Sequence, residues 1–489
     1  MGPIPFDNSY ARLPAHLYTR LEPTSVSSPA LIRVNGPLAT QLGIDAHWLQ
    51  SNEGIATVAG NHVPAGAEPL AAVYAGHQFG SYNPQLGDGR ALLLGEVIDE
   101  NGKRSDIQLK GSGPTPYSRG GDGRSPLGPV LREYIVSEAM HALGVPTTRA
   151  LAAVTTGERV MRDTILPGAV LARVAASHIC IGTFQFFAAN KDREALQSLV
   201  EHCLQRHYPQ QANSDNPALA LLQAVIRAQA LLVSRWQLLG FIHGVMNTDN
   251  MLICGETVDY GPCAFMDDFD PGKVFSSIDR GGRYAYRNQP GIAPWNLAVL
   301  AQALLPLLHD DQEQAVALAQ EAVDTFPELF EAAHLKGLAD KLGVAEITDA
   351  DKPLVDELFQ LMTDEHSDFT LTFRRLYDHA NNPRAQVGQW FELPDSFIPW
   401  LSRWRSRLEH DQLTPDTREQ RMRRANPALI PRNHKVEEAI RAAEDADDLR
   451  PFNALVGRLT TPFDIDSQSA GFALPPRPEE QVTRTFCGT

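Results

Sequence analysis

The pattern of apolar and polar positions changes about one third of the way along the chain. In the first third, short apolar runs alternate with loops rich in glycine and proline. Residues 91–98 and 105–110 flank a turn at Asn101-Gly102 and predict a β-hairpin. Further strands are expected within 150–174. From about residue 183 the apolar residues recur at helical spacing, so strands early and helices late predict an α+β, two-lobed fold.

Capping signals delimit the expected helices. One should begin near Ser125, with Pro126 at its first helical position, and end before Gly144. The other clear helical segments are 192–207, 216–239, 294–308, 311–325, 329–342 and 352–362, with more amphipathic segments to about 443. The expected divisions are an irregular N-terminal extension (1–85), a strand-rich lobe (86–182), a helical lobe (183–445) and a loosely attached tail (446–489).

Length and composition argue against several classes of protein. The 489 residues exceed a single typical domain of about 100–200 residues. The net charge of -16 argues against nucleic acid and anionic membrane as main partners. No apolar run is expected to span a membrane, the N-terminus lacks signal-peptide features, and the five cysteines are scattered. We therefore expect a cytoplasmic protein that binds neither nucleic acid nor membrane.

The segment 241–268, FIHGVMNTDNMLICGETVDYGPCAFMDD, places polar acids between apolar runs. Its piece HGVMNTDN has the length of the protein-kinase catalytic loop H-R-D-L-x-x-x-N, with His243 first and Asn250 last. Asp259 opens a D-Y-G tripeptide where kinases carry D-F-G. The kinase base, the Asp of H-R-D, is replaced by Val245. The segment therefore predicts a metal site without the usual base.

The predicted hairpin carries candidate phosphate ligands. The loop from Gly87 to Arg90 lies where a kinase has its glycine-rich phosphate cover, although such glycines alone are more often a plain turn. Lys110 ends the second strand and faces away from its apolar neighbours, as a phosphate-binding lysine or a solvated strand end would. The glycine-rich loop 111–124 would let backbone N–H groups approach an anion.

Two further charged residues belong to this set. Glu133 lies on the flank of the apolar stripe of the helix near 126–143, where it could reach Lys110 or stay a surface acid. Arg173, at the end of a predicted strand, is another candidate phosphate ligand.

Several long motifs make the chain resemble the selenoprotein O family, kinase-like proteins that act as protein adenylyltransferases. The motifs are FDNSY near the start, GDGR at 87–90, KGSGPTPYSRGGDGRSPLGPVLREYIVSEAM at 110–140, SHI and GTFQFF at 177–187, HGVMNTDNM at 243–251, DYGPCAFMD at 259–267, GRYAY at 282–286 and NPALIPRNH at 426–434. The resemblance covers essentially the whole chain. It implies a protein-kinase-like two-lobed fold with an N-terminal extension and additional C-terminal helices.

The resemblance also implies an activity. ATP would bind in a flipped orientation, AMP would pass to a protein Ser, Thr or Tyr hydroxyl, and pyrophosphate would leave. The implied nucleotide contacts are Gly87, Gly89, Arg90, Lys110, Asp122, Gly123 and Arg173, with Asp259. Glu133 would hold Lys110, and Asp249 would accept the proton. Asn250 and Asp259 would bind Mg2+, with Mn2+ as a variant.

The chain departs from the family pattern in two places. Cys180 stands where the family usually has Arg in SHIRxGTFQ, so one phosphate contact is expected to be missing unless a neighbour such as Arg162 replaces it. Some members are regulated by a disulfide between the terminal cysteine and the activation loop. Here Cys487 has no cysteine partner in that loop, DPGKVFSSIDRGGRYAY.

Three alternatives to AMP transfer stay open. A non-catalytic ATP-binding scaffold would explain the missing Asp at Val245, but it has no need of a full metal site. Ordinary phosphotransfer would need a base at that position. UMP transfer from UTP with Mn2+ is a close variant that the sequence does not exclude.

Overall fold

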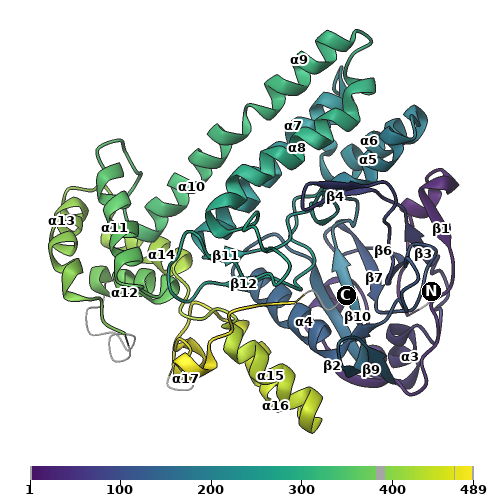
Figure 1. Cartoon of the computed structure of the whole chain (residues 1–489), viewed down its shortest axis with the longest axis horizontal. Helices are drawn as coiled ribbons and strands as arrows, with labels where there is room; N and C mark the ends of the chain where they lie inside the picture. Colours follow the sequence, from purple (N-terminus) through teal and green to yellow (C-terminus); the bar gives the residue numbers. More distant parts are fainter. Residues whose placement is uncertain (1–2, 382–390, 467–468, 487–489) are drawn as a thin grey trace.

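A computed structural model of the chain describes residues 3–381, 391–466 and 469–486. It shows a mixed α/β molecule in which one large sheet, built from the first 175 residues, lies beside a group of long helices (Figure 1). The predicted combination of early strands and late helices is confirmed at this level.

The main sheet has the order β1-β3-β6-β7-β10-β9-β2, with β8 also paired to β10. The strands are β1 (Tyr18–Arg20), β2 (Ala30–Val34), β3 (Leu70–Ala72), β4 (Gly76–Gln78), β5 (Ser81–Asn83), β6 (Ala91–Ile98), β7 (Arg104–Lys110), β8 (Ser125–Pro126), β9 (Arg149–Met161), β10 (Ile165–Ala175), β11 (Phe241–Ile242) and β12 (Ala264–Phe265). Neighbouring strands are antiparallel. The predicted hairpin is β6–β7, and the register sets Lys110 opposite Ala91 and Leu171.

The helices fall into three groups along the chain. The first group is α1 (Gly36–Gln41), α2 (Ala46–Leu49), α3 (Asn52–Ala59) and α4 (Leu127–Ala142). The second is α5 (Ile181–Ala189), α6 (Arg193–His207), α7 (Pro217–Leu238), α8 (Gln289–Leu308), α9 (Gln312–Val323) and α10 (Phe326–Leu342). The third is α11 (Lys352–Asp364), α12 (Phe369–Asn381), α13 (Ile398–Glu409), α14 (Pro415–Ala425), α15 (Asn433–Ala446), α16 (Arg450–Leu459) and α17 (Ala470–Ala473).

Several boundaries differ from the sequence-based expectation. Ser125 and Pro126 do not start the helix, because they pair with Ala169 and Gly168 of β10, and α4 therefore begins at Leu127. Helix α8 begins at Gln289, before Pro294. A proline is tolerated in its first turn because the N–H groups there have no partner within the helix. The first 85 residues are less irregular than expected, because β1, β2 and β3 join the main sheet.

The closing segment is also better attached than its sequence suggests. Phe452, Leu455, Val456 and Leu459 recur at helical spacing on α16 and are buried in a cluster with α4 and α15. Farther on, Thr485 donates its backbone N–H to Phe275 O at 2.8 Å, and its carbonyl oxygen accepts from Ser277 N at 3.0 Å.

The two faces of the sheet have different cover. One face packs against α1–α3 and includes the buried Ile107 and Leu109 of β7. The other face packs against α4, which is backed by α15 and α16. Because side chains alternate along a strand, Gln108 and Lys110 of β7 point to the α4 face. The candidate phosphate lysine is thereby aimed at Glu133 of α4.

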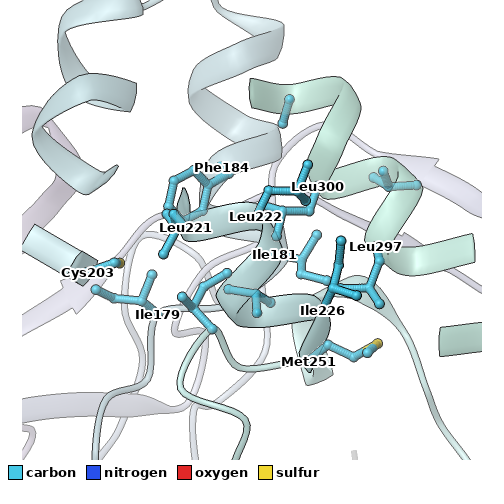
Figure 2. Close-up of a cluster of buried hydrophobic side chains, with 14 of the residues drawn as sticks. Ile179, Ile181, Phe184, Cys203, Leu221, Leu222, Ile226, Met251, Leu297 and Leu300 are labelled. Carbon is cyan, nitrogen blue, oxygen red and sulfur yellow. The ribbon is translucent and has the colours of Figure 1, made fainter. Parts of the chain in front are cut away.

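The second group of helices packs around α7, and its core reaches the loop that follows β11. Figure 2 shows Phe184, Leu221, Leu222, Ile226, Leu297 and Leu300 meeting Ile179, Ile181 and Met251. Two helical segments, Pro217–Leu238 and Tyr286–Leu308, are long and apolar enough for a membrane span by length and composition, which the sequence reading missed. Of their most apolar stretches, 61% and 44% are buried inside the molecule, as core helices would be.

Candidate active site

Two connected cavities lie between the main sheet and the loops that follow β11. The outer cavity has a volume of about 840 Å3 and the inner one about 100 Å3. Both are lined by Gly89, Arg90, Asp249, Asn250 and Asp259, so they form one continuous site. Residues from the first hairpin of the sheet thus meet residues some 150 positions later in the sequence.

The glycine-rich loops form part of the outer wall. Gly87 has φ +138°, and a Cβ there would lie 2.5 Å from the Tyr117 ring and 2.9 Å from Ala72 O. Gly123 has φ +64°, and a Cβ there would lie 2.1 Å from the carbonyl of Gly113. A side chain at residue 87 would push its loop away from Tyr117, and one at residue 123 would clash within the loop 111–124 itself, which explains the glycines.

A four-residue charge cluster occupies the inner end of the site. Lys110 Nζ lies 2.5 Å from Glu133 Oε2 and also donates to Asp259 Oδ1. Arg173 Nη1 lies 3.0 Å from Glu133 Oε1, and its guanidinium also donates to Gln108 Oε1. The cluster carries two positive and two negative side chains. The hypothesis that Glu133 reaches Lys110 is confirmed as a contact.

The charges perturb the acids of this cluster. Burial alone would raise the pKa of Asp259, but Lys110, Arg90 and Arg173 outweigh it and hold that pKa well below its usual value. Burial likewise opposes ionisation of Glu133, and Lys110 with Arg173 lowers its pKa overall. Both carboxylates are therefore ionised at neutral pH, so each of them can pair with a cation.

Asp249 and Asn250 sit on a short 3-10 turn, Thr248–Asn250, that faces both cavities. Asn250 Nδ2 donates to Val245 O at 3.0 Å, which leaves its side-chain oxygen for a ligand. Asp249 Oδ2 accepts from Gln78 Nε2 at 3.0 Å. Burial raises the pKa of Asp249 to about 6. The two neighbours therefore differ: Asn250 offers a neutral oxygen, whereas Asp249 offers a carboxylate whose pKa is raised toward neutrality.

His243 has a supporting place. Its Nε2 lies 2.8 Å from Val258 O, and its ring stacks on Trp236 with centroids 5.2 Å apart. The side chain is buried and does not line either cavity. It joins the turn that carries Asp249 to the segment that precedes Asp259.

Asp122 and Gly123 line the outer cavity but not the inner one, which contains Lys110. The Asp122 carboxylate pairs with the Arg162 guanidinium at 2.9 and 3.1 Å. The structure thus brings every candidate residue to the two cavities except Glu133, which lies behind Lys110 and Arg173.

Sequence reasoning missed Gln78 and Gln108, which contact Asp249 and Arg173. Neither belongs to a motif for chemistry. Gln108 could have been found, because strand alternation places it on the same face as Lys110. Gln78 lies on the small β4–β5 hairpin, whose contact with a loop 171 positions away has no local signal.

Comparisons with known proteins show to which family the chain belongs. A family model described as protein adenylyltransferase SelO matches residues 3–460. The chain belongs to the SelO family. It is similar to the protein nucleotidyltransferase YdiU of Rhodopseudomonas palustris (strain BisB18), with 57% identity over 487 residues, and of Methylorubrum extorquens, with 58% over 494. A relative with the same name from Bradyrhizobium sp. (strain ORS 278) is 57% identical over 487 residues, and each comparison covers 99% of both chains.

Membership of the SelO family confirms the resemblance and the expectation that the chain is a nucleotidyltransferase. Cys180, which stands where the resemblance implies an Arg, is buried and lines the inner cavity, as do Lys110 and Arg173. Arg162 lines the outer cavity, where it pairs with Asp122, and its substitution for the expected Arg stays a prediction. Cys487 lies outside the described residues, and its redox role stays a prediction.

Proposed function

We propose that this SelO-family enzyme transfers AMP from ATP to Ser, Thr or Tyr hydroxyls of acceptor proteins and releases pyrophosphate. The observation that carries the proposal is that two buried cations line only the smaller of the two cavities. Lys110 and Arg173 line the inner cavity alone, whereas the outer one adds Arg119, Arg124 and Arg162 to the shared Arg90 and also includes the apolar surfaces of Leu86, Tyr117 and Met161.

This distribution favours a flipped nucleotide. Adenosine needs width and apolar surface, which the outer cavity of about 840 Å3 offers, so the β and γ phosphates would lie in the inner cavity beside Lys110 and Arg173. The α phosphorus then lies at the junction, beside Asp249, Asn250 and Asp259, which line both cavities. Positive charge from Lys110 and Arg173 would stabilise the leaving pyrophosphate.

The residues at the junction fit a divalent metal ion. Asn250 offers an oxygen and Asp259 an ionised carboxylate, hard donors of the kind that Mg2+ prefers. The described residues contain no group of three or more His, Cys, Asp and Glu side chains suited to a metal, so phosphate and water would complete the coordination. When bound, the ion would neutralise phosphate charge, and Mn2+ would use the same donors.

Asp249 is the proposed proton acceptor. As the acceptor oxygen bonds to the α phosphorus, its proton passes to the Asp249 carboxylate and the bond from the α phosphorus to the bridging oxygen breaks. Val245 lines the outer cavity where a kinase would have its base, so the proton acceptor has moved four positions along the loop.

The architecture that accompanies this function is proposed to be kinase-like and two-lobed. Strands β6–β10 of the main sheet, with α4, would form the smaller lobe over 86–182, and the helices from α5 onward the larger lobe over 183–445. The extension (1–85) and the tail (446–489) would be added to both. We propose that the enzyme works in the cytoplasm on protein acceptors.

The test is transfer of label from ATP to protein acceptors in a cell lysate and to the enzyme itself. ATP labelled at the α phosphate should label protein, and ATP labelled at the γ phosphate should not. Asp259→Asn should abolish the signal, whereas Asp310→Asn, a control at a side chain that is 98% exposed, should not. Label from the γ phosphate would mean phosphotransfer, and binding of ATP without any transfer would favour the scaffold.

UMP transfer is the second candidate, because the similar proteins are named nucleotidyltransferases without a stated base. The same assay with UTP and Mn2+ distinguishes the two. A higher kcat/KM for UTP than for ATP under either metal would replace AMP by UMP in the proposal.

A further inference from the structure

A small hairpin outside the recognised motifs holds the loop that carries Asp249. Three successive hairpin residues bond to three successive loop residues. His77 N donates to Thr248 Oγ1 at 2.7 Å, Gln78 Nε2 to Asp249 Oδ2 at 3.0 Å, and Phe79 N to Asn247 Oδ1 at 3.1 Å. Each of these three hairpin residues therefore bonds to a different residue of the loop.

The two oxygens of the Asp249 carboxylate have different surroundings. Oδ1 is buried and has no hydrogen-bond partner among the described residues, and a Cβ on Gly76 would lie only 2.8 Å from it. A side chain at residue 76 would therefore displace the carboxylate. Oδ2 carries the bond from Gln78, a residue that itself lines the outer cavity. Because Oδ1 is buried, an acceptor hydroxyl would reach the carboxylate at Oδ2, and Gln78 would set the direction of that oxygen.

The hairpin is itself anchored from behind. Ala75 N donates to Gly182 O at 3.0 Å, and the Gln185 amide lies 2.8 Å from His77 Nδ1. The Phe79 ring packs on Tyr284 with centroids 5.1 Å apart, and Tyr284 OH donates to the same Asn247 Oδ1 at 2.8 Å. Gln78 therefore extends from a rigid support, as a residue that orients another group must.

We propose that Gln78 is a positioning residue that aims Asp249 Oδ2 at the acceptor hydroxyl, with Gly76 making room for Oδ1. The inference rests on the proposed AMP transfer and on Asp249 as proton acceptor. Gln78 exchanges no proton itself. Its N–H donor fixes the carboxylate, so the acceptor's proton meets Oδ2 as the bond from the acceptor oxygen to the α phosphorus forms.

The test compares Gln78→Met, which keeps the length of the side chain and removes the donor, with wild type. The rate of AMP transfer, kcat, should fall about tenfold to a hundredfold, as expected for a misaligned catalytic group. Gln78 lines the outer cavity that is proposed to hold adenosine, but Met keeps the length and bulk of the side chain there and the inner cavity is unchanged. The KM for ATP and the Kd for ATP by calorimetry should therefore stay within about twofold.

Gln237→Met is the matched control. Gln237 is a buried glutamine that donates one bond, to Tyr286 O at 2.9 Å, on α7 away from both cavities. Its loss should lower stability and leave kcat unchanged. A second variant, Gln78→Glu, places a negative charge beside Asp249 and should lower kcat further than Gln78→Met does.

The outcomes separate the inference from the proposed function. Wild-type transfer with an unchanged kcat in Gln78→Met, or an equal loss of kcat in Gln237→Met, would overturn the role of Gln78 alone. Absence of AMP transfer by the wild-type enzyme would overturn the proposed function, and this inference with it.

Discussion

Removal of one charge from the inner cluster should cost far more stability than a surface change. The side chain of Glu133 is 4% exposed and accepts charged bonds from Lys110 and Arg173. Two such bonds contribute about 3–6 kcal/mol together. The loss on replacing Glu133 is smaller than this sum, because Lys110 still pairs with Asp259. We expect Glu133→Gln to lower the free energy of unfolding by about 3 kcal/mol, at the lower end for a broken buried ion pair.

A double-mutant cycle tests whether charge balance is the cause. Glu133→Gln leaves the cluster with an excess positive charge, and Lys110→Met leaves an excess negative one. The double variant keeps only Arg173 and Asp259, which lie 3.7 Å apart and balance each other. Its loss of stability should therefore be smaller than the sum of the single losses by about 1–2 kcal/mol.

Urea unfolding followed by tryptophan fluorescence measures these differences. Glu100→Gln, at an exposed acid after β6, is the control and should change stability by less than about 0.5 kcal/mol. A loss below about 1 kcal/mol for Glu133→Gln, or strictly additive losses in the cycle, would refute the view that the four charges act as one buried unit.

Three further predictions concern other parts of the molecule. Cys180→Arg should tighten ATP binding, because it adds a cation to the inner cavity, and an unchanged Kd by calorimetry would count against this. Burial lowers the pKa of Lys341 to about 7 from an unfolded value of about 10.4, so the unfolded chain binds more protons between these values and stability should rise with pH. Between pH 7 and 9, the free energy of unfolding of the wild type, measured in urea, should rise relative to that of Lys341→Met by up to about 1.4 kcal/mol per pH unit. Parallel curves for the two proteins would exclude this. Thr485→Val, which removes a buried bond to Pro262 O, should lower the free energy of unfolding by about 1 kcal/mol, and no change would show that this bond does not hold the tail.

Local patterns were enough to predict much of the site. Strand alternation aimed Lys110 at the α4 face, and helical spacing placed Glu133 within its reach. The length of the loop from His243 to Asn250 and the D-Y-G at Asp259 placed the junction residues. In each case the deciding information lies within one element or one short loop.

Contacts between distant segments had no such signal. The strands β1–β3 read as irregular because each is short and its partners lie far along the chain. Nothing in the sequence distinguishes Gln78, because its contact with Asp249 depends on how the β4–β5 hairpin packs on a distant loop. The burial of Thr485 likewise depends on Phe275 and Ser277, about 210 positions earlier.

The most direct measurement of the central claim is a crystal structure of the enzyme with Mg2+ and a non-hydrolysable ATP analogue. Flipped binding places the β and γ phosphates in the inner cavity beside Lys110 and Arg173, the α phosphorus beside Asp249 and Asn250, and adenine in the outer cavity. Adenine in the inner cavity, with the γ phosphate facing Asp249, would contradict the account and indicate a phosphotransferase.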